Sequence, residues 1–168
     1  MYIHVEDSFG CLMIITVLRD FYSLLITGRP IIAIDHGIKT LGFAVSDQLL
    51  NIAMPLENLN SRVEEQQILA SLNLVDKYSA CGIVVGLPMM MDGSISEQTV
   101  IVQKFVAQLS LRSTLPIYMQ DERLTSRAAN SLLKSLGLNR KNRTNHDDSI
   151  AASMILETVL TSIRTSGL

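Results

Sequence analysis

Short apolar runs alternate with amphipathic stretches along most of this chain, which is the pattern of strands followed by helices. A β-branched run over residues 31–35 is followed by a tight turn, bracketed by Gly37 and Gly42, and by a second strand-like run over residues 41–46, so the segment predicts a β-hairpin. A third strand is expected over residues 52–56, where Pro55 favours a strand end or a sheet edge.

The rest of the pattern alternates strands with helices. Residues 82–87 form an uninterrupted apolar run, which predicts a strand buried on both faces, and residues 115–119 form the next strand. Ser94 and Glu97 have the spacing of a capping box, which predicts the start of a helix. This order predicts an α/β fold, a mixed sheet with helices on both faces. The expected helices cover residues 63–78, the stretch that carries Ile101, Phe105 and Leu109, residues 125–136 and residues 147–163.

The N-terminal part of the chain differs from this pattern. Residues 1–29 read as an N-terminal extension with a short helix over residues 17–25, and residues 30–168 as a single domain. Met13 is an alternative start, in which case the residues before it are dispensable. The apolar run of residues 11–18 is too short to span a bilayer, and acidic residues precede it, which argues against a secretory signal.

Composition narrows the class of protein. A chain of 168 residues with 48% hydrophobic residues is expected to form one compact domain with its own core. The net charge of −2 gives no global basic field, which counts mildly against nucleic acid, although acidic metal ligands mask local basic patches. Cys11 and Cys81 have no metal-binding spacing and suggest no disulfide framework, so a reduced, cytoplasmic setting fits.

Three acidic signals carry the candidate chemistry. Asp35 and the pair Asp121-Glu122 each end a predicted strand, and the pair Asp147-Asp148 opens a predicted helix. Carboxylates at strand ends and at a helix start converge on one point in many α/β folds. Converging carboxylates repel one another unless a bound divalent metal ion neutralises their charge. The pattern therefore indicates metal-dependent phosphodiester chemistry.

Each acidic signal also has a structural explanation. Asp35 is equally well placed to bond the turn that follows it, and acidic residues are favoured in a first helical turn whatever the function. Neighbours on a strand point to opposite faces, so only one of Asp121 and Glu122 can serve the site, and both could instead pair with Arg123 at a solvated strand end.

Basic residues cluster in the last third of the chain, near two of the acidic signals. Such a patch would hold backbone phosphates of a nucleic acid. A solvated helix face and loop explain the same residues at least as well. The cluster consists of Arg123, Arg127, Lys134, Arg140, Lys141 and Arg143.

Four blocks of sequence surround these signals: residues 34–47 (IDHGIKTLGFAVSD), 84–88 (VVGLP) with Asp92-Gly93-Ser94, 121–126 (DERLTS) and 148–152 (DSIAA). In this order and spacing they resemble the YqgF/RuvX family over roughly residues 31–160. The resemblance implies an RNase H-like fold with a mixed five-stranded sheet, an antiparallel hairpin plus parallel strands. It also implies a bacterial cytosolic nuclease that matures the 5′ end of pre-16S rRNA. An older interpretation of the family is a Holliday junction resolvase.

The resemblance carries the family's acidic positions onto Asp35, Glu122 and Asp148, which would bind Mg²⁺ or Mn²⁺, although spacing alone does not choose between Asp148 and its neighbour. Lys39 and Arg123 match motif positions expected to contact phosphate, and Arg127 is a further candidate from the basic cluster. The expected partner is nucleic acid, RNA in preference to DNA, together with the ribosome or pre-ribosomal particles. The chain is expected to be a monomer or homodimer and to have no membrane partner.

The chain departs from the family pattern in two places. His36 and Ile38 replace residues more usual in the first block, and the strand that ends at Gly86-Leu87 has no acid at its tip, unlike RuvC-like resolvases.

Two other classes of protein are alternatives to the nuclease. An actin-like ATP-binding protein also begins with a strand, an aspartate and a hairpin, but the chain is short for two lobes and shows no second phosphate loop. A non-catalytic RNA-binding or ribosome-assembly factor with the same fold is the other alternative.

Overall fold

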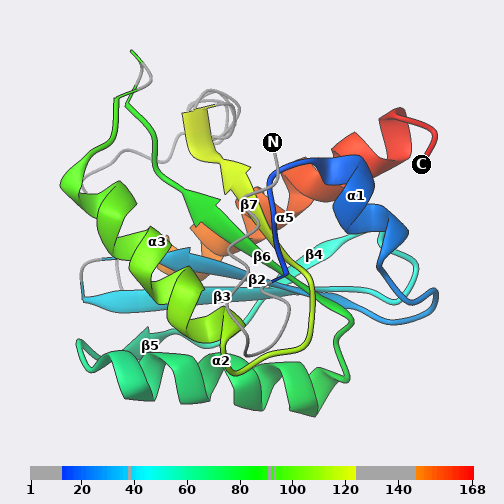
Figure 1. Ribbon diagram of the computed structural model, residues 1–168. Coiled ribbons are helices and arrows are strands. Elements are labelled where there is room, and N and C mark those ends of the chain that lie inside the picture. Colours follow the sequence, from blue (N-terminus) through cyan, green and yellow to red (C-terminus); the bar gives the residue numbers. More distant parts are fainter. Residues whose placement is uncertain (1–12, 38, 91, 93, 124–146) are drawn as a thin grey trace.

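The computed structural model describes residues 13–37, 39–90, 92, 94–123 and 147–168. Within these ranges the chain forms one mixed sheet between two layers of helices (Figure 1). The strands are β1 (Ile14–Ile15), β2 (Ile31–His36), β3 (Thr40–Ser46), β4 (Ala53–Pro55), β5 (Leu59–Asn60), β6 (Gly82–Leu87) and β7 (Ile117–Asp121). The helices are α1 (Leu18–Ser23), α2 (Glu64–Tyr78), α3 (Glu97–Ser110) and α5 (Asp147–Thr165).

The strand order of the sheet is β1-β7-β6-β2-β3-β4, and β5 pairs with β3. Strands β2 and β3 form the predicted antiparallel hairpin, in which Asp35 is the Cα partner of Gly42. Strands β2, β6 and β7 run parallel to one another. The mixed α/β fold predicted from the sequence is therefore confirmed.

The described part of the sheet has seven strands, so the predicted count of five is wrong. Strands β1 and β5 each contain two residues, too few to show the alternation of apolar and polar residues that reveals a strand. Strand β1 adds a parallel edge beside β7, with Ile117 N donating to Met13 O at 2.8 Å. The N-terminal segment is thus built into the sheet.

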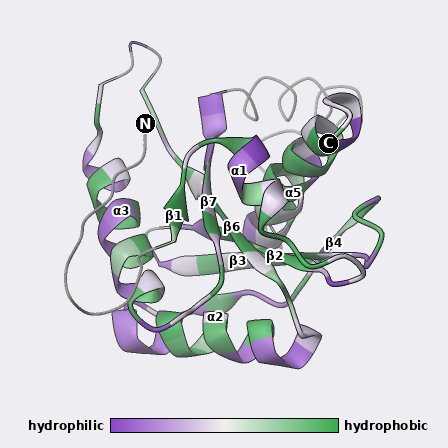
Figure 2. Cartoon of the chain, turned by 45° about the vertical axis from the view of Figure 1, so that its right-hand side comes forward, coloured by the Kyte–Doolittle hydropathy of each residue, from purple (hydrophilic) through white to green (hydrophobic). Residues whose placement is uncertain are grey.

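Side chains along β2 alternate between the two faces of the sheet and so build two cores. Ile32 and Ile34 pack in the core below α2 and α3, whereas Ile31 and Ala33 pack in the core below α1 and α5 (Figures 1 and 2). All four side chains are fully buried, which stabilises the sheet through the hydrophobic effect from both sides. The alternation puts Asp35 on the α5 side of the sheet and His36 on the α2 and α3 side.

The N-terminal helix joins the second of these cores. Phe21 of α1 is fully buried and stacks on Tyr118 of β7, with ring centroids 5.5 Å apart. The amphipathic helix predicted over residues 17–25 is therefore present over Leu18–Ser23. The division of the chain at residues 29 and 30 into extension and domain stays a prediction.

Two local predictions need correction. Helix α3 is capped by Ser96, whose side chain accepts from Thr99 N at 3.1 Å while Thr99 Oγ1 accepts from Ser96 N at 3.1 Å. The capping box predicted at Ser94 and Glu97 is wrong, because the threonine at the third helical position takes the part usually played by glutamate. Strand β7 extends to Asp121, two residues beyond the prediction.

Helix α5 is the longest described helix, with 19 residues, and covers β3 and β2. Ile155, Leu156 and Val159 of this helix are buried against the sheet, while Ile150 is exposed. None of the helices in the described ranges is long and apolar enough to cross a membrane. The helix predicted over residues 125–136 lies outside those ranges.

Candidate active site

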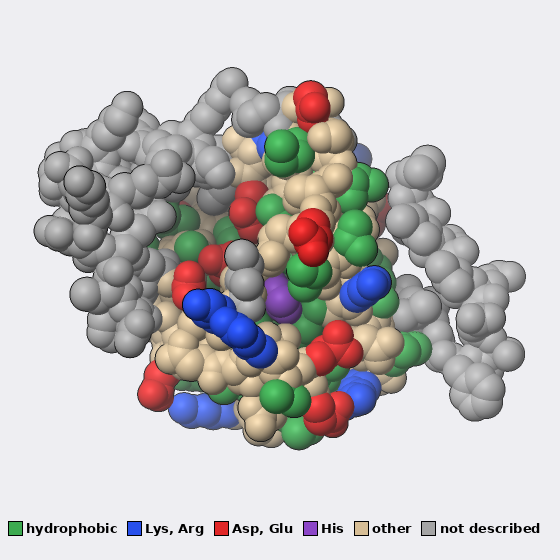
Figure 3. All heavy atoms as spheres, turned by 90° about the vertical axis from the view of Figure 1, so that its left-hand side faces the viewer, with side chains coloured by type: hydrophobic (Ala, Val, Ile, Leu, Met, Phe, Trp, Pro, Cys, Tyr) green, Lys and Arg blue, Asp and Glu red, His purple; other side chains and the backbone are tan. Residues whose placement is uncertain are grey.

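The three acidic signals lie at one edge of the sheet. Strands β2, β6 and β7 are parallel, so their carboxyl ends share this edge. Asp35 is the fifth residue of β2, and Glu122 directly follows β7. Asp148 lies in the first turn of α5, which packs on β3 and β2. Acidic side chains gather on this face of the molecule in Figure 3, with a basic side chain beside them.

Gly42 brings the start of α5 against the sheet next to Asp35. A Cβ atom at Gly42 would lie 1.9 Å from the main-chain oxygen of Asp148 and 2.9 Å from Ser149 N. Only glycine, which has no Cβ, allows so close an approach. Since Gly42 is the cross-strand partner of Asp35, the same contact holds Asp148 beside Asp35.

Gly86 likewise leaves the space that the Glu122 side chain occupies. A Cβ atom at Gly86 would lie 2.3 Å from Glu122 Oε1 and 2.6 Å from Ile155 Cδ1. The Glu122 side chain therefore lies over β6, on the face that α5 covers. Strand β6 pairs with β2 up to Ile34, so Gly86 and Asp35 each follow the last paired residues.

The electrostatics of Asp35 reflect this crowding. Burial, followed by the negative charges of Glu122 and Asp148, raises the pKa of Asp35 from 3.8 to about 7. Burial also raises the pKa of Glu122, with a smaller contribution from the charge of Asp121. Both groups lack a compensating positive charge among the described residues, so a bound cation would favour their ionised forms.

Asp121 and Glu122 differ in their interactions. The Arg123 guanidinium donates from Nε to both carboxylate oxygens of Asp121, at 2.9 and 3.1 Å, and Arg123 N donates to Oδ1 at 2.9 Å. These bonds hold the pKa of Asp121 below its usual range. The two neighbouring acids are thus divided as strand alternation requires, with Asp121 paired to Arg123 and Glu122 placed over Gly86.

The predicted phosphate-binding residues lie in different surroundings. Lys39 is exposed in the turn between β2 and β3. Arg123 is half-buried and bonded to Asp121, so a phosphate would compete with that carboxylate or share the guanidinium. Arg127 lies outside the described residues.

Thr40 and Gln98 are contacts that the sequence analysis missed. Thr40 Oγ1 donates a hydrogen bond to Asp148 Oδ2. Gln98 Nε2 donates to the main-chain oxygen of His36 at 2.7 Å, which ties the end of β2 to α3. Alternation along β3 puts Thr40 on the same face as Gly42, and that was the available signal for its role.

The His36 side chain lies on the opposite face from Asp35 and is buried. His36 Nε2 is 3.2 Å from Gln67 Oε1, and the ring lies 4.8 Å from that of Phe105. Because Gln67 Nε2 donates to Ser61 O, Gln67 Oε1 is the acceptor and His36 Nε2 carries the proton. Burial lowers the pKa of His36, and its Nδ1 has no hydrogen-bond partner among the described residues. His36 therefore anchors the strand end in neutral form.

The residue types suit a hard divalent cation. Carboxylate oxygens are the ligands that Mg²⁺ and Mn²⁺ prefer, and the crowded acids around Asp35 disfavour full ionisation without one. Over the described ranges, no group of three or more His, Cys, Asp or Glu side chains is already arranged to hold a metal ion. The carboxylates of Asp35, Glu122 and Asp148 are thus suitable ligands for Mg²⁺ or Mn²⁺, but they do not already converge on a single point.

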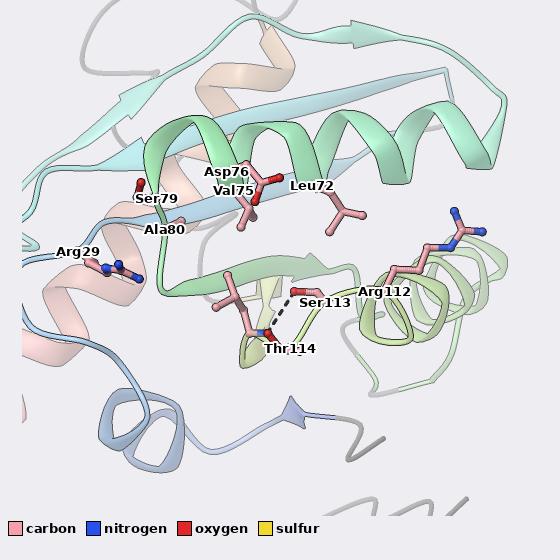
Figure 4. A pocket seen from close by; sticks show the side chains of 10 residues that line it. Arg29, Leu72, Val75, Asp76, Ser79, Ala80, Arg112, Ser113 and Thr114 are labelled. Carbon is pink, nitrogen blue, oxygen red and sulfur yellow. Dashed lines mark hydrogen bonds between the residues drawn. The ribbon is translucent and has the colours of Figure 1, made fainter. Parts of the chain in front are cut away.

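A separate pocket of about 420 Å³ lies at the amino ends of β2, β6 and β7, the opposite edge from Asp35 (Figure 4). Leu72, Val75 and Leu115 contribute apolar lining. Arg29 and Arg112 lie at its two ends. None of the candidate acids lines this pocket, so it is not the site of the acid-based chemistry.

Comparison with known proteins is consistent with this arrangement. A family model described as "RuvX: Holliday junction resolvase" matches residues 29–162. The chain is 55% identical over 152 residues to a protein of Rickettsia africae (strain ESF-5) named "Putative pre-16S rRNA nuclease", covering 90% of this chain and 99% of that protein. A protein of the same name from Rickettsia rickettsii (strain Sheila Smith) matches with the same identity and coverage.

Among solved structures, RuvC of T. thermophilus in complex with a Holliday junction substrate matches with a TM-score of 0.53. The match covers 82% of this chain and 96% of that chain at 16% identity. At that identity the likeness shows the fold alone. The RuvC-like, RNase H-like fold expected from the sequence is thereby confirmed.

Proposed function

This chain belongs to the RuvX family, and from that membership we propose that it is a nuclease that hydrolyses phosphodiester bonds in nucleic acid. The substrate we propose is precursor 16S rRNA, cut at its 5′ end during ribosome biogenesis. Relatives that share 55% of their residues over almost their whole length carry that activity in their names, which supports the choice of RNA.

The coupling of Asp35 to two other acids is the observation that carries the proposal. A buried carboxylate beside two like charges is costly to keep ionised. Here both the burial of Asp35 and the charges of Glu122 and Asp148 raise its pKa. Two glycines, Gly42 and Gly86, make room for this crowding at the carboxyl edge of the sheet. An arrangement that is unfavourable alone becomes favourable once a cation binds.

In the proposed site, Asp35, Glu122 and Asp148 hold Mg²⁺ or Mn²⁺. When bound, such a cation supplies a Lewis acid for the phosphoryl oxygen and lowers the pKa of bound water. Lys39, exposed in the adjoining turn, binds a phosphate of the nucleic-acid backbone. Arg123, which is bonded to Asp121, binds a second phosphate, and Arg127 is the third basic residue assigned to substrate. Together they offset the repulsion between the acids and the polyanion.

Cleavage of four-way DNA junctions is the second candidate function. It is favoured by the description of the matching family and by the fold shared with RuvC. Against it, strand β6 ends at Leu87 and is followed by Pro88, so its tip offers no further acid.

For the nuclease acting on precursor rRNA, the proposed setting is the cytoplasm, on pre-ribosomal particles, with the chain acting as a monomer or homodimer.

A cleavage assay with two substrates tests the proposal. Purified protein is incubated with Mg²⁺ or Mn²⁺ and either precursor 16S rRNA or a four-way DNA junction, and products are mapped at nucleotide resolution. We expect metal-dependent cuts near the 5′ end of the rRNA and little cleavage of the junction. Asp35→Asn should abolish the cuts, whereas Asp76→Asn, an exposed acid on α2, should not. Cleavage by Asp35→Asn at the wild-type rate would overturn the mechanism.

A further inference from the structure

A hydrogen bond joins the hairpin to the helix that bears the third acid. Thr40, the first residue of β3, donates from Oγ1 to Oδ2 of Asp148, a residue 108 positions later in the chain. Thr40 is half-buried and lies directly after the exposed Lys39. The bond therefore connects the candidate site to the turn between β2 and β3, which carries the proposed phosphate-binding residue Lys39.

The donor has a fixed place relative to Asp35. Gly37 N donates to Thr40 O at 2.9 Å, which closes the turn between β2 and β3. The next residues along the hairpin are paired, His36 with Leu41 and Asp35 with Gly42. Because Thr40 is held by the turn at one side and by the ladder at the other, its backbone has a fixed position relative to Asp35.

The acceptor is held at a second point. Gly42 and Thr40 are two residues apart on β3, so both lie on the face that α5 covers. The backbone of Asp148 touches β3 at Gly42, and its side chain touches β3 at Thr40. Two contacts with one strand fix both the position of the residue and the direction of its carboxylate. Within the described residues, the other carboxylate oxygen, Oδ1, accepts no hydrogen bond.

We propose that Thr40 is a positioning residue, whose hydroxyl holds the Asp148 carboxylate toward Asp35 so that Oδ1 is presented to the divalent cation. The inference rests on the proposed function and adds to it a residue outside the three acids. Repulsion between like charges favours rotation of the Asp148 side chain away from Asp35. A charge-assisted hydrogen bond from Thr40 opposes that rotation and so lowers the cost of binding the cation.

Cation binding to the free protein tests the proposal without relying on cleavage. Mn²⁺ binding is measured by calorimetry on the full chain, without nucleic acid, for the wild type, Thr40→Val and Thr40→Ser. Valine keeps the shape of threonine and removes the donor, whereas serine keeps the donor. We expect Thr40→Val to bind Mn²⁺ about tenfold more weakly, in line with loss of one hydrogen bond to a charged group. Thr40→Ser should bind within about twofold of the wild type, since the donor remains.

Ser46→Ala is the matched control, at the other end of the same strand. Ser46 is buried, and its Oγ accepts from Ile31 N at 2.9 Å, so its removal weakens the sheet away from the site. We expect Ser46→Ala to lower the melting temperature of the metal-free protein and to leave Mn²⁺ affinity unchanged. Thr40→Val should show the reverse, a weaker Mn²⁺ affinity with a nearly unchanged melting temperature.

The possible results separate this inference from the proposed function. If Thr40→Val binds Mn²⁺ as well as the wild type while Asp148→Asn does not, the positioning role is wrong and the metal site stands. Equal weakening in Thr40→Val and Thr40→Ser would also overturn the role, because packing rather than the hydroxyl would be responsible. If Asp35→Asn binds Mn²⁺ like the wild type, the metal site itself is wrong.

Discussion

Asp35 and Gly42 are paired across the hairpin, and the space that a Gly42 side chain would occupy is filled by the main-chain oxygen of Asp148. One glycine thereby connects the acid at the end of β2 with the acid at the start of α5. The chain separates these two acids by more than a hundred residues, so their proximity depends on how closely α5 approaches β3.

Gly42→Ala should damage both stability and activity. The added methyl group would lie 1.9 Å from backbone oxygen, which cannot turn aside as a side chain can, so the first turn of α5 must shift. We expect a loss of roughly 1–3 kcal/mol in the free energy of unfolding, the usual cost of forcing extra volume into a packed site. Urea denaturation measures that loss. Wild-type stability and cleavage in Gly42→Ala would contradict the close approach of α5.

Gly86→Ala should separate activity from stability. The groups that its methyl group would meet, Glu122 Oε1 and Ile155 Cδ1, are the ends of flexible side chains and can move. We expect a smaller loss of stability than in Gly42→Ala, and a loss of Mn²⁺ affinity and cleavage because Glu122 is displaced. Comparing the two alanine variants by urea denaturation and calorimetry provides the check. A Gly86→Ala protein with unchanged Mn²⁺ affinity would argue against Glu122 as a ligand.

The stability of the metal-free protein should fall as pH rises from about 4 to about 7. The pKa of Asp35 is raised from 3.8 to about 7, so the folded state holds its proton more tightly than the unfolded chain does. The resulting stabilisation is complete below the unfolded pKa and disappears as pH passes the folded pKa, a difference of at most roughly 4 kcal/mol. The raised pKa of Glu122 acts in the same direction.

Urea denaturation at several pH values, with a chelator present, measures this dependence. Asp35→Asn, which does not titrate, should show a much weaker decline over the same range. Adding Mn²⁺ at pH 8 should restore stability to the wild type and not to Asp35→Asn. If the wild type and Asp35→Asn show the same dependence on pH, Asp35 does not have the raised pKa described here.

Arg123→Gln should weaken substrate binding more than it weakens the fold. The Arg123 and Asp121 side chains of this ion pair are half-buried and reach solvent, and ion pairs that reach solvent contribute little to stability. If Arg123 binds a phosphate, the variant should show a several-fold higher KM for RNA, a similar kcat and a shallower dependence of KM on salt. Arg164→Gln is the matched control, because Arg164 is paired with Glu157 in a comparable exposed bridge on α5. Equal KM values for the two variants would exclude the role for Arg123.

Apolar runs and the acids at their ends predicted much of this architecture. The runs at β2, β3 and β6 are long enough to be recognised as buried strands, and the division of Asp121 and Glu122 between faces follows from strand geometry. The two-residue strands β1 and β5 are too short to be recognised from the sequence. The bond from Thr40 to Asp148 and the fit of Glu122 over Gly86 depend on tertiary packing, which no local pattern contains.

In the proposed site, Asp35, Glu122 and Asp148 share a divalent cation, and diffraction from crystals grown with Mn²⁺ shows whether they do. Anomalous scattering locates manganese without assumptions about ligands. We expect an anomalous peak within coordination distance of all three carboxylates, absent from crystals of Asp35→Asn. A peak elsewhere on the molecule, or none at saturating Mn²⁺, would show that these acids do not share a cation.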